Sequence, residues 1–168
     1  LKKMNINIIN QLQDYLSNAG EAVQRVLFVA ETKNPIYEDS QEVLQLAQKQ
    51  IVAPLGVMPN EEVYAFIGVH SKTVISGKMD SVGFVITNFR VLTQTDVSVI
   101  STPKKANSHL FTNKDNPDNL SNQLWQNFII KVDETIPKEY VTMLEAPLKA
   151  VLAIVLPELK KEGYLPDE

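Results

Sequence analysis

The chain has 168 residues, of which 44% are hydrophobic and 21% charged, a composition typical of a globular domain rather than a disordered chain. It has no cysteine, which excludes disulfide scaffolds, thiol catalysis and thiolate metal sites. The net charge of −4 argues against nucleic acid as a partner, because phosphate binding depends on clustered lysine and arginine.

The sequence contains no segment that predicts export or a membrane span. The N-terminal residues carry Lys2 and Lys3, but several asparagines follow and no small-residue cleavage site does. The longest apolar run, residues 146–156, is too short to cross a bilayer and contains Lys149. We therefore expect a cytoplasmic protein that forms a single domain over residues 1–168.

The first region, residues 1–56, is predicted to be helical. Apolar residues recur at steps of one, three and four from Ile8 to Ala19, and Gly20 predicts a break. Residues 26–29 fit either a helix or a strand. Asp39 to Glu42 has the form of a capping box, which predicts a helix that Pro54 ends.

The middle region, residues 61–113, changes to a period of two, which is typical of strands. Turn signals at residues 77–80, 87–90 and 95–96 separate short runs rich in Val, Ile and Thr. Residues 109–112 add a further edge strand. No helical crossover separates these runs, so we expect an antiparallel meander of five or six strands.

The last region, residues 116–163, returns to a helical period. Asn116-Pro117-Asp118 is a helix-start signal, and a stripe of apolar residues around Trp125 follows it. Pro137 opens a final helix, which Pro147 is expected to kink or divide and Gly163 to cap. The fold class is therefore α+β, with a meander sheet flanked by N-terminal and C-terminal helices.

One segment carries a family resemblance. Residues 82–92, which read VGFVITNFRVL, resemble the hairpin of bacterial pleckstrin-homology-like and GRAM-like domains, and residues 62–66 fit the strand that precedes it. The resemblance implies a pleckstrin-homology-like curved sheet closed by a C-terminal helix. It also implies a binding module rather than an enzyme, although a fold does not by itself fix a function.

Three basic residues form the candidate ligand-binding set: Lys72, Lys78 and Arg90. They lie near hairpin ends, where they could bind an anionic lipid headgroup or a phosphopeptide. The alternative interpretation of Arg90, which we favour, is a solvent-facing strand residue paired with a nearby carboxylate.

No residue pattern predicts a catalytic, cofactor or metal site. His70 and His109 are the only histidines, and neither has a carboxylate at ligand spacing. No nucleophile elbow or phosphate loop is present. An enzyme would need a site assembled from distant residues, for example His70, Glu62 and His109 within hydrogen-bonding reach.

We therefore expect a non-enzymatic protein-binding module, without a cofactor, whose partner is another protein. An immunity protein or inhibitor that neutralises a toxin fits this class. Two alternatives stay open: a lipid- or phosphopeptide-binding pleckstrin-homology-like adaptor, and an enzyme with a dispersed His/Glu site. Nucleic acid is not expected as a partner, nor is a membrane surface, and the sequence leaves the oligomeric state open.

Overall fold

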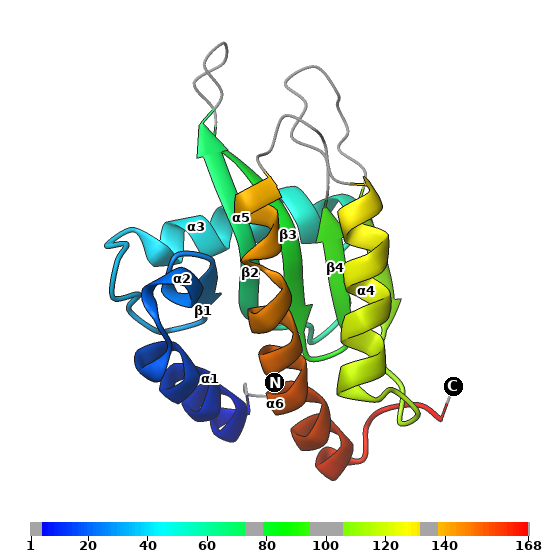
Figure 1. The fold of residues 1–168 in the computed structure, drawn as a ribbon. Helices are drawn as coiled ribbons and strands as arrows, with labels where there is room; N and C mark the ends of the chain where they lie inside the picture. The colour runs from blue at the N-terminus through cyan, green and yellow to red at the C-terminus, as the bar shows by residue number, and fades with distance from the viewer. Residues whose placement is uncertain (1–4, 73–78, 95–105, 132–137, 168) are drawn as a thin grey trace.

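The computed structural model describes residues 5–72, 79–94, 106–131 and 138–167, and its architecture is α+β (Figure 1). Five antiparallel strands form one sheet in the order β1-β2-β3-β4-β5, so each strand pairs with its neighbour in sequence. This confirms the predicted meander. The strands are β1 (Leu27–Val29), β2 (Val63–Lys72), β3 (Met79–Thr87), β4 (Arg90–Gln94) and β5 (Ala106–Leu110).

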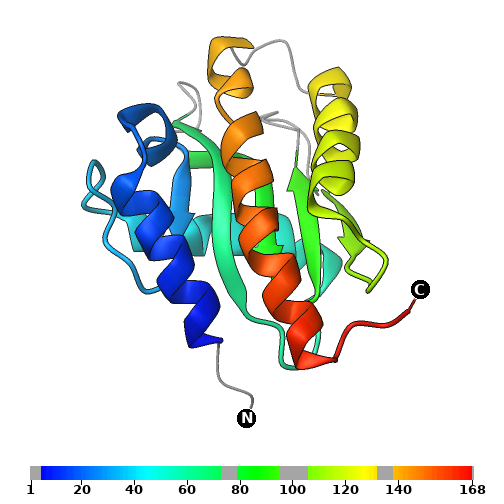
Figure 2. The same ribbon diagram turned by 60° about the horizontal axis from the view of Figure 1, so that its bottom comes forward.

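Helices cover both faces of the sheet (Figures 1 and 2). One face carries α1 (Ile6–Asn18), α4 (Pro117–Lys131) and α6 (Glu145–Glu162). The other face carries α3 (Ser40–Ala47), which continues as the π-helix η1 (Gln48–Val52) and the 3-10 helix η2 (Ala53–Leu55). Two short helices, α2 (Glu21–Gln24) and α5 (Lys138–Thr142), lead into β1 and α6.

The N-terminal helical region divides as its sequence predicts at Gly20, which lies between α1 and α2. The side chain of Asn5 caps α1 by accepting hydrogen bonds from the amides of Asn7 and Ile8. Residues 26–29, which fitted two structures, contain the edge strand β1, and its three residues are buried. β1 pairs with β2 in antiparallel register, so the backbone groups on its inner side form ladder hydrogen bonds while its apolar side chains are buried.

The capping box expected at Asp39 is not formed. Asp39 precedes α3, but its side chain makes no capping hydrogen bond, and its backbone (φ −92°, ψ 25°) lies outside the extended region that a capping residue normally adopts. Pro54 lies within η2, and the helical path ends two residues later at Gly56, whose φ of +84° suits glycine.

The β3–β4 hairpin turns at residues 87–90, as predicted. The hydroxyl oxygen of Thr87 accepts hydrogen bonds from the amides of Phe89 and Arg90. The predicted edge strand at 109–112 is β5, displaced to residues 106–110. The expected turn at 95–96 and the strand after it lie outside the described residues, as do residues 77 and 78 of the first expected turn.

Two glycines face each other across β2 and β3. A Cβ atom on Gly83 would lie 2.2 Å from the carbonyl oxygen of Ile67, and Gly83 has φ +148°. A Cβ atom on Gly68 would lie 2.4 Å from the ring of Phe66. Both positions therefore require glycine, because strand and ring approach the backbone too closely for any side chain.

The C-terminal helices confirm the predicted division. α5 ends at Thr142 and α6 begins at Glu145, so Pro147 lies in the first turn of α6, where its missing amide costs little. Gly163 caps α6 in a left-handed conformation. Pro157 lies inside α6, which continues past it.

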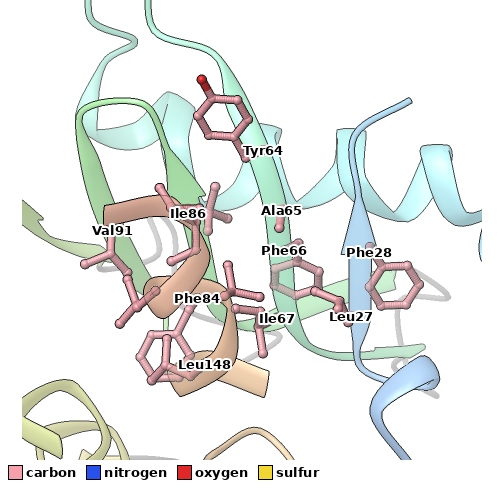
Figure 3. Packing of buried hydrophobic residues seen from close by; sticks show 14 of the residues in the cluster. Leu27, Phe28, Tyr64, Ala65, Phe66, Ile67, Phe84, Ile86, Val91 and Leu148 are labelled. Carbon is pink, nitrogen blue, oxygen red and sulfur yellow. The ribbon is translucent and has the colours of Figure 1, made fainter. Parts of the chain in front are cut away.

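The predicted apolar face of the C-terminal helices is buried against the sheet, where Leu148 lies close to Phe84 (Figure 3). Its members are Val141, Leu144, Leu148, Val151, Leu152, Val155 and Leu159.

Candidate functional site

The structure describes only one side chain of the candidate set Lys72, Lys78 and Arg90. Lys78 lies outside the described residues. Lys72 is the last residue of β2, and its side chain also lies outside the described part of the chain. Arg90 opens β4 and is 6% exposed. The expectation that Arg90 faces solvent is therefore wrong, whereas its pairing with a carboxylate is confirmed.

The partner of Arg90 is Glu61, and the two side chains meet in a bidentate arrangement. Arg90 Nε donates to Glu61 Oε2 at 2.8 Å, and Nη2 donates to Oε1 at 2.9 Å. The same Nη2 donates to the carbonyl oxygen of Gly56 at 2.6 Å. The Glu61 carboxylate also accepts from the Thr87 hydroxyl at 2.8 Å. These contacts join the end of η2, the start of β2 and the β3–β4 turn. The role of Arg90 is therefore structural: it holds these three segments together.

The environment of Glu61 favours its ionised form. Burial raises the pKa of the Glu61 carboxyl, but hydrogen bonds from Arg90, the Met58 amide and Thr87, together with the charge of Arg90, outweigh burial and lower the pKa below its ordinary value of 4.5. The guanidinium is thus already neutralised, which removes it from the set of cations available to an anionic ligand.

The dispersed site of His70, Glu62 and His109 is not assembled. Glu62 precedes β2 and His70 lies near its other end, roughly 25 Å away at about 3.3 Å per strand residue. His109 lies in the cross-strand row of Val91 and Ala65, on the opposite face of the sheet from His70. The structure therefore contradicts this particular grouping.

His70 lies in an aromatic environment. Its ring meets Phe28 and Tyr37 edge-on, with centroid separations of 5.6 and 5.3 Å. Its Nδ1 is buried, and no described residue forms a hydrogen bond with it. Burial lowers the pKa of His70 below 6.5, and the charge of Asp39 opposes this shift in part.

His109 has a different environment and contacts the Asp115 carboxylate through Nε2 at 3.0 Å. Among the described residues, no group of three or more His, Asp or Glu side chains could hold a metal ion.

A cavity of about 380 Å³ opens between α3, η1 and the start of β2. Its carboxylates are Glu31, Glu61 and Glu62, of which Glu61 is bound by Arg90. Oε2 of Glu62 is buried and has no hydrogen-bond partner among the described residues. The remaining lining residues are Ala30, Gln41, Leu44, Gln45, Gln48, Val52, Val57 and Val63. The sequence reasoning did not find this cavity, because its walls come from segments that are brought together only by folding.

Three exposed apolar residues come from neighbouring segments beside this cavity, because the segment formed by η2 and the residues after it contacts β5. They are Leu55, Val57 and Leu110, which are 41%, 64% and 53% exposed and are called the apolar patch below. Leu110 pairs with Arg90 across β4 and β5, so the two side chains project from the same face of the sheet. On this face the Arg90 side chain donates to the carbonyl oxygen of Gly56, so Leu110 lies next to the end of η2. Val57 belongs to both the apolar patch and the cavity lining.

Within the part of the chain that the structure describes, one segment, residues 138–162, is long and apolar enough to cross a membrane by length and composition alone. In the structure this segment forms α5 and α6, and its buried residues pack in the core. A core helix passes the same test, so this segment is weak evidence for a membrane span.

No protein-family model and no curated protein matches the sequence, and no solved structure matches the fold. The resemblance of residues 82–92 to pleckstrin-homology-like domains therefore stays a prediction. In the structure these residues form most of β3, its turn and the first part of β4.

Proposed function

We propose that the chain is a non-enzymatic protein-binding module whose binding surface is the apolar patch of Leu55, Val57 and Leu110 together with the outer edge of β5. The observation that carries this proposal is that three large apolar side chains are exposed on segments in contact with each other, η2 with the residues after it and β5. Exposed apolar side chains that cluster in this way are typical of protein interaction sites.

The adjoining edge supports the same surface. β5 is the outermost strand, and no described residue pairs with its outer edge. Its residues Ala106 to Leu110 include no charged residue and no proline, the features that usually protect an edge from pairing. An extended segment of a partner could add to β5 as a further strand, with its apolar side chains on the patch.

The charge of the chain suggests the character of the partner. A net charge of −4 favours a basic protein, because complementary charge increases the association rate and selects among partners. An immunity protein or inhibitor that neutralises a toxin is the narrower form of this proposal. The lipid- or phosphopeptide-binding alternative now depends on Lys72 and Lys78, without Arg90.

Site-specific photo-crosslinking in the source cell tests the surface. A photoreactive benzoylphenylalanine at position 110 is expected to capture one protein, and the same residue at exposed position 10 of α1, the matched control, is expected not to capture it. Capture of another copy of this chain, or of the same proteins from both positions, would contradict the proposal.

A further inference from the structure

The cavity beside the apolar patch has a chemical character of its own. Its apolar walls come from both the helical layer and the sheet, chiefly Leu44, Val52 and Val63. Gln45 and Gln48 add amide groups that can both donate and accept hydrogen bonds. A volume of about 380 Å³ is near the lower end for ligand sites, and it suits a single long side chain.

The carboxylates of the cavity are not balanced by positive charge. Glu61 is neutralised by Arg90, but among the residues that the structure describes Glu31 and Glu62 form no salt bridge, and the lining includes no Lys, Arg or His. Oε2 of Glu62 is shielded from solvent and accepts no hydrogen bond from the residues that the structure describes. A carboxylate oxygen in that position is costly unless a donor reaches it, and a cationic donor offsets the cost best.

Glu31 is fixed in place at the same opening. Its amide donates to Gln41 Oε1, while the Gln41 side-chain nitrogen donates to the carbonyl oxygens of Val29 and Thr32. Gln41 thus holds the loop after β1 against α3. The backbone of Glu31 is therefore held at the opening of the cavity, where its side chain is exposed.

We infer that this cavity binds a lysine or arginine side chain that the protein partner inserts, with the aliphatic stem on Leu44, Val52 and Val63 and the charged end at Glu62. The inference rests on the proposed function, since Val57 joins the cavity to the apolar patch. The partner segment then carries apolar residues for the patch and a basic residue for the cavity.

Nuclear magnetic resonance titration of the full chain with n-butylguanidinium tests the cavity without the partner. We expect saturable amide shifts at Gln45, Gln48 and Val63, and no such shifts with n-butanol, which has the same stem without charge. Glu62→Gln is expected to weaken binding about tenfold, as loss of a charge-assisted hydrogen bond does. The matched control Glu42→Gln, an exposed carboxylate of α3 outside the cavity, is expected to leave binding unchanged.

Equal shifts with n-butanol, or unchanged binding in Glu62→Gln, would overturn the inference. Such a result leaves the photo-crosslink at position 110 unaffected, so it does not touch the proposed function. If butylguanidinium binds while position 110 captures no partner, the proposed function fails. The cavity is then a site for a free amine or guanidine, and its assignment to a partner's side chain is overturned as well.

Discussion

Arg90 and Glu61, 29 residues apart in sequence, form a bidentate ion pair in which both side chains are buried, at 7% and 1% exposure. Removing two charges from water is costly, and their attraction offsets this cost when the geometry is good and the remaining hydrogen bonds are satisfied. Here the Gly56 carbonyl and the Thr87 hydroxyl supply further bonds. The ion pair therefore fixes the position of Glu61, which lines the cavity, relative to Gly56, which lies beside the apolar patch.

Breaking one side of this pair is expected to destabilise the fold strongly. Arg90→Met leaves Glu61 as an uncompensated buried charge, and Glu61→Leu leaves Arg90 in the same position. Each single change is expected to lower the free energy of unfolding by about 3–5 kcal/mol. The double variant, which removes both charges, is expected to lose much less than the sum. Urea unfolding of the four proteins at neutral pH measures the coupling.

A double variant that lost the sum of the two single effects would contradict this account of the ion pair. Arg25 and Glu21 provide a matched control, because they form an exposed pair within one helix. Substituting Arg25→Met is expected to leave the free energy of unfolding nearly unchanged, because an ion pair in full contact with solvent contributes little.

The pH dependence of stability is expected to depend on His70. Because burial lowers the pKa of His70 below 6.5, the unfolded chain binds more protons than the folded chain between the two values. The contribution of His70 is thus complete above pH 6.5 and is lost as the pH falls through the folded pKa. Unfolding measured from pH 7.5 to 5 should show a decrease in stability, and His70→Leu and His70→Gln should reduce its slope. An unchanged slope in both variants would refute the role of His70.

Local patterns predicted most of the fold. The helix breaks at Gly20 and before Pro147 and the turn after Thr87 follow from backbone chemistry that a few neighbouring residues determine. The alternation of apolar residues likewise predicted the meander. Asp39 is the exception, because the loop before α3 gives it a backbone conformation that sequence spacing does not reveal.

The candidate site was much less predictable. The sequence places Arg90 among three basic residues near hairpin ends, but its burial depends on Glu61 and Gly56, which reach it only through the folding of η2 and β2. The cavity depends in the same way on the packing of α3 and η1 against the sheet. In the sequence, two adjacent glutamates such as Glu61 and Glu62 resemble solvent-exposed residues at the end of a helix or strand. In the structure the Glu61 carboxylate is paired with Arg90, and Glu62 lines the cavity.

Gly83 is expected to tolerate no side chain. Gly83→Ala would place Cβ 2.2 Å from the Ile67 carbonyl oxygen at a φ of +148°, so both contact and backbone become unfavourable. We expect a loss of at least about 2–3 kcal/mol in the free energy of unfolding. Gly20→Ala is the control, since nothing lies within 4 Å of its Cβ position, and it should cost less than about 1 kcal/mol. Equal losses in thermal unfolding of the two variants would contradict the close approach of β2 and β3.

Asn34 holds the loop between β1 and α3 with all the hydrogen-bonding groups of its amide. Its nitrogen donates to the carbonyl oxygens of Gln24 and Leu27 at 2.8 and 3.0 Å, and its oxygen accepts from the amides of Ile36 and Tyr37. The residue is 8% exposed. Each bond uses a different donor or acceptor site of the amide, so the nearly isosteric change Asn34→Asp removes the two donors and keeps the acceptors.

In Asn34→Asp the carboxylate still accepts from Ile36 and Tyr37 but cannot donate to the two carbonyl oxygens, which it repels instead. We expect the free energy of unfolding to fall by about 2–4 kcal/mol at pH 7, because two buried acceptors lose their partner and a charge is buried. Urea unfolding at pH 7 measures the loss, and the exposed control Asn10→Asp should change stability by less than about 0.5 kcal/mol. Equal stability of the two variants would show that the Asn34 donors contribute nothing to the fold.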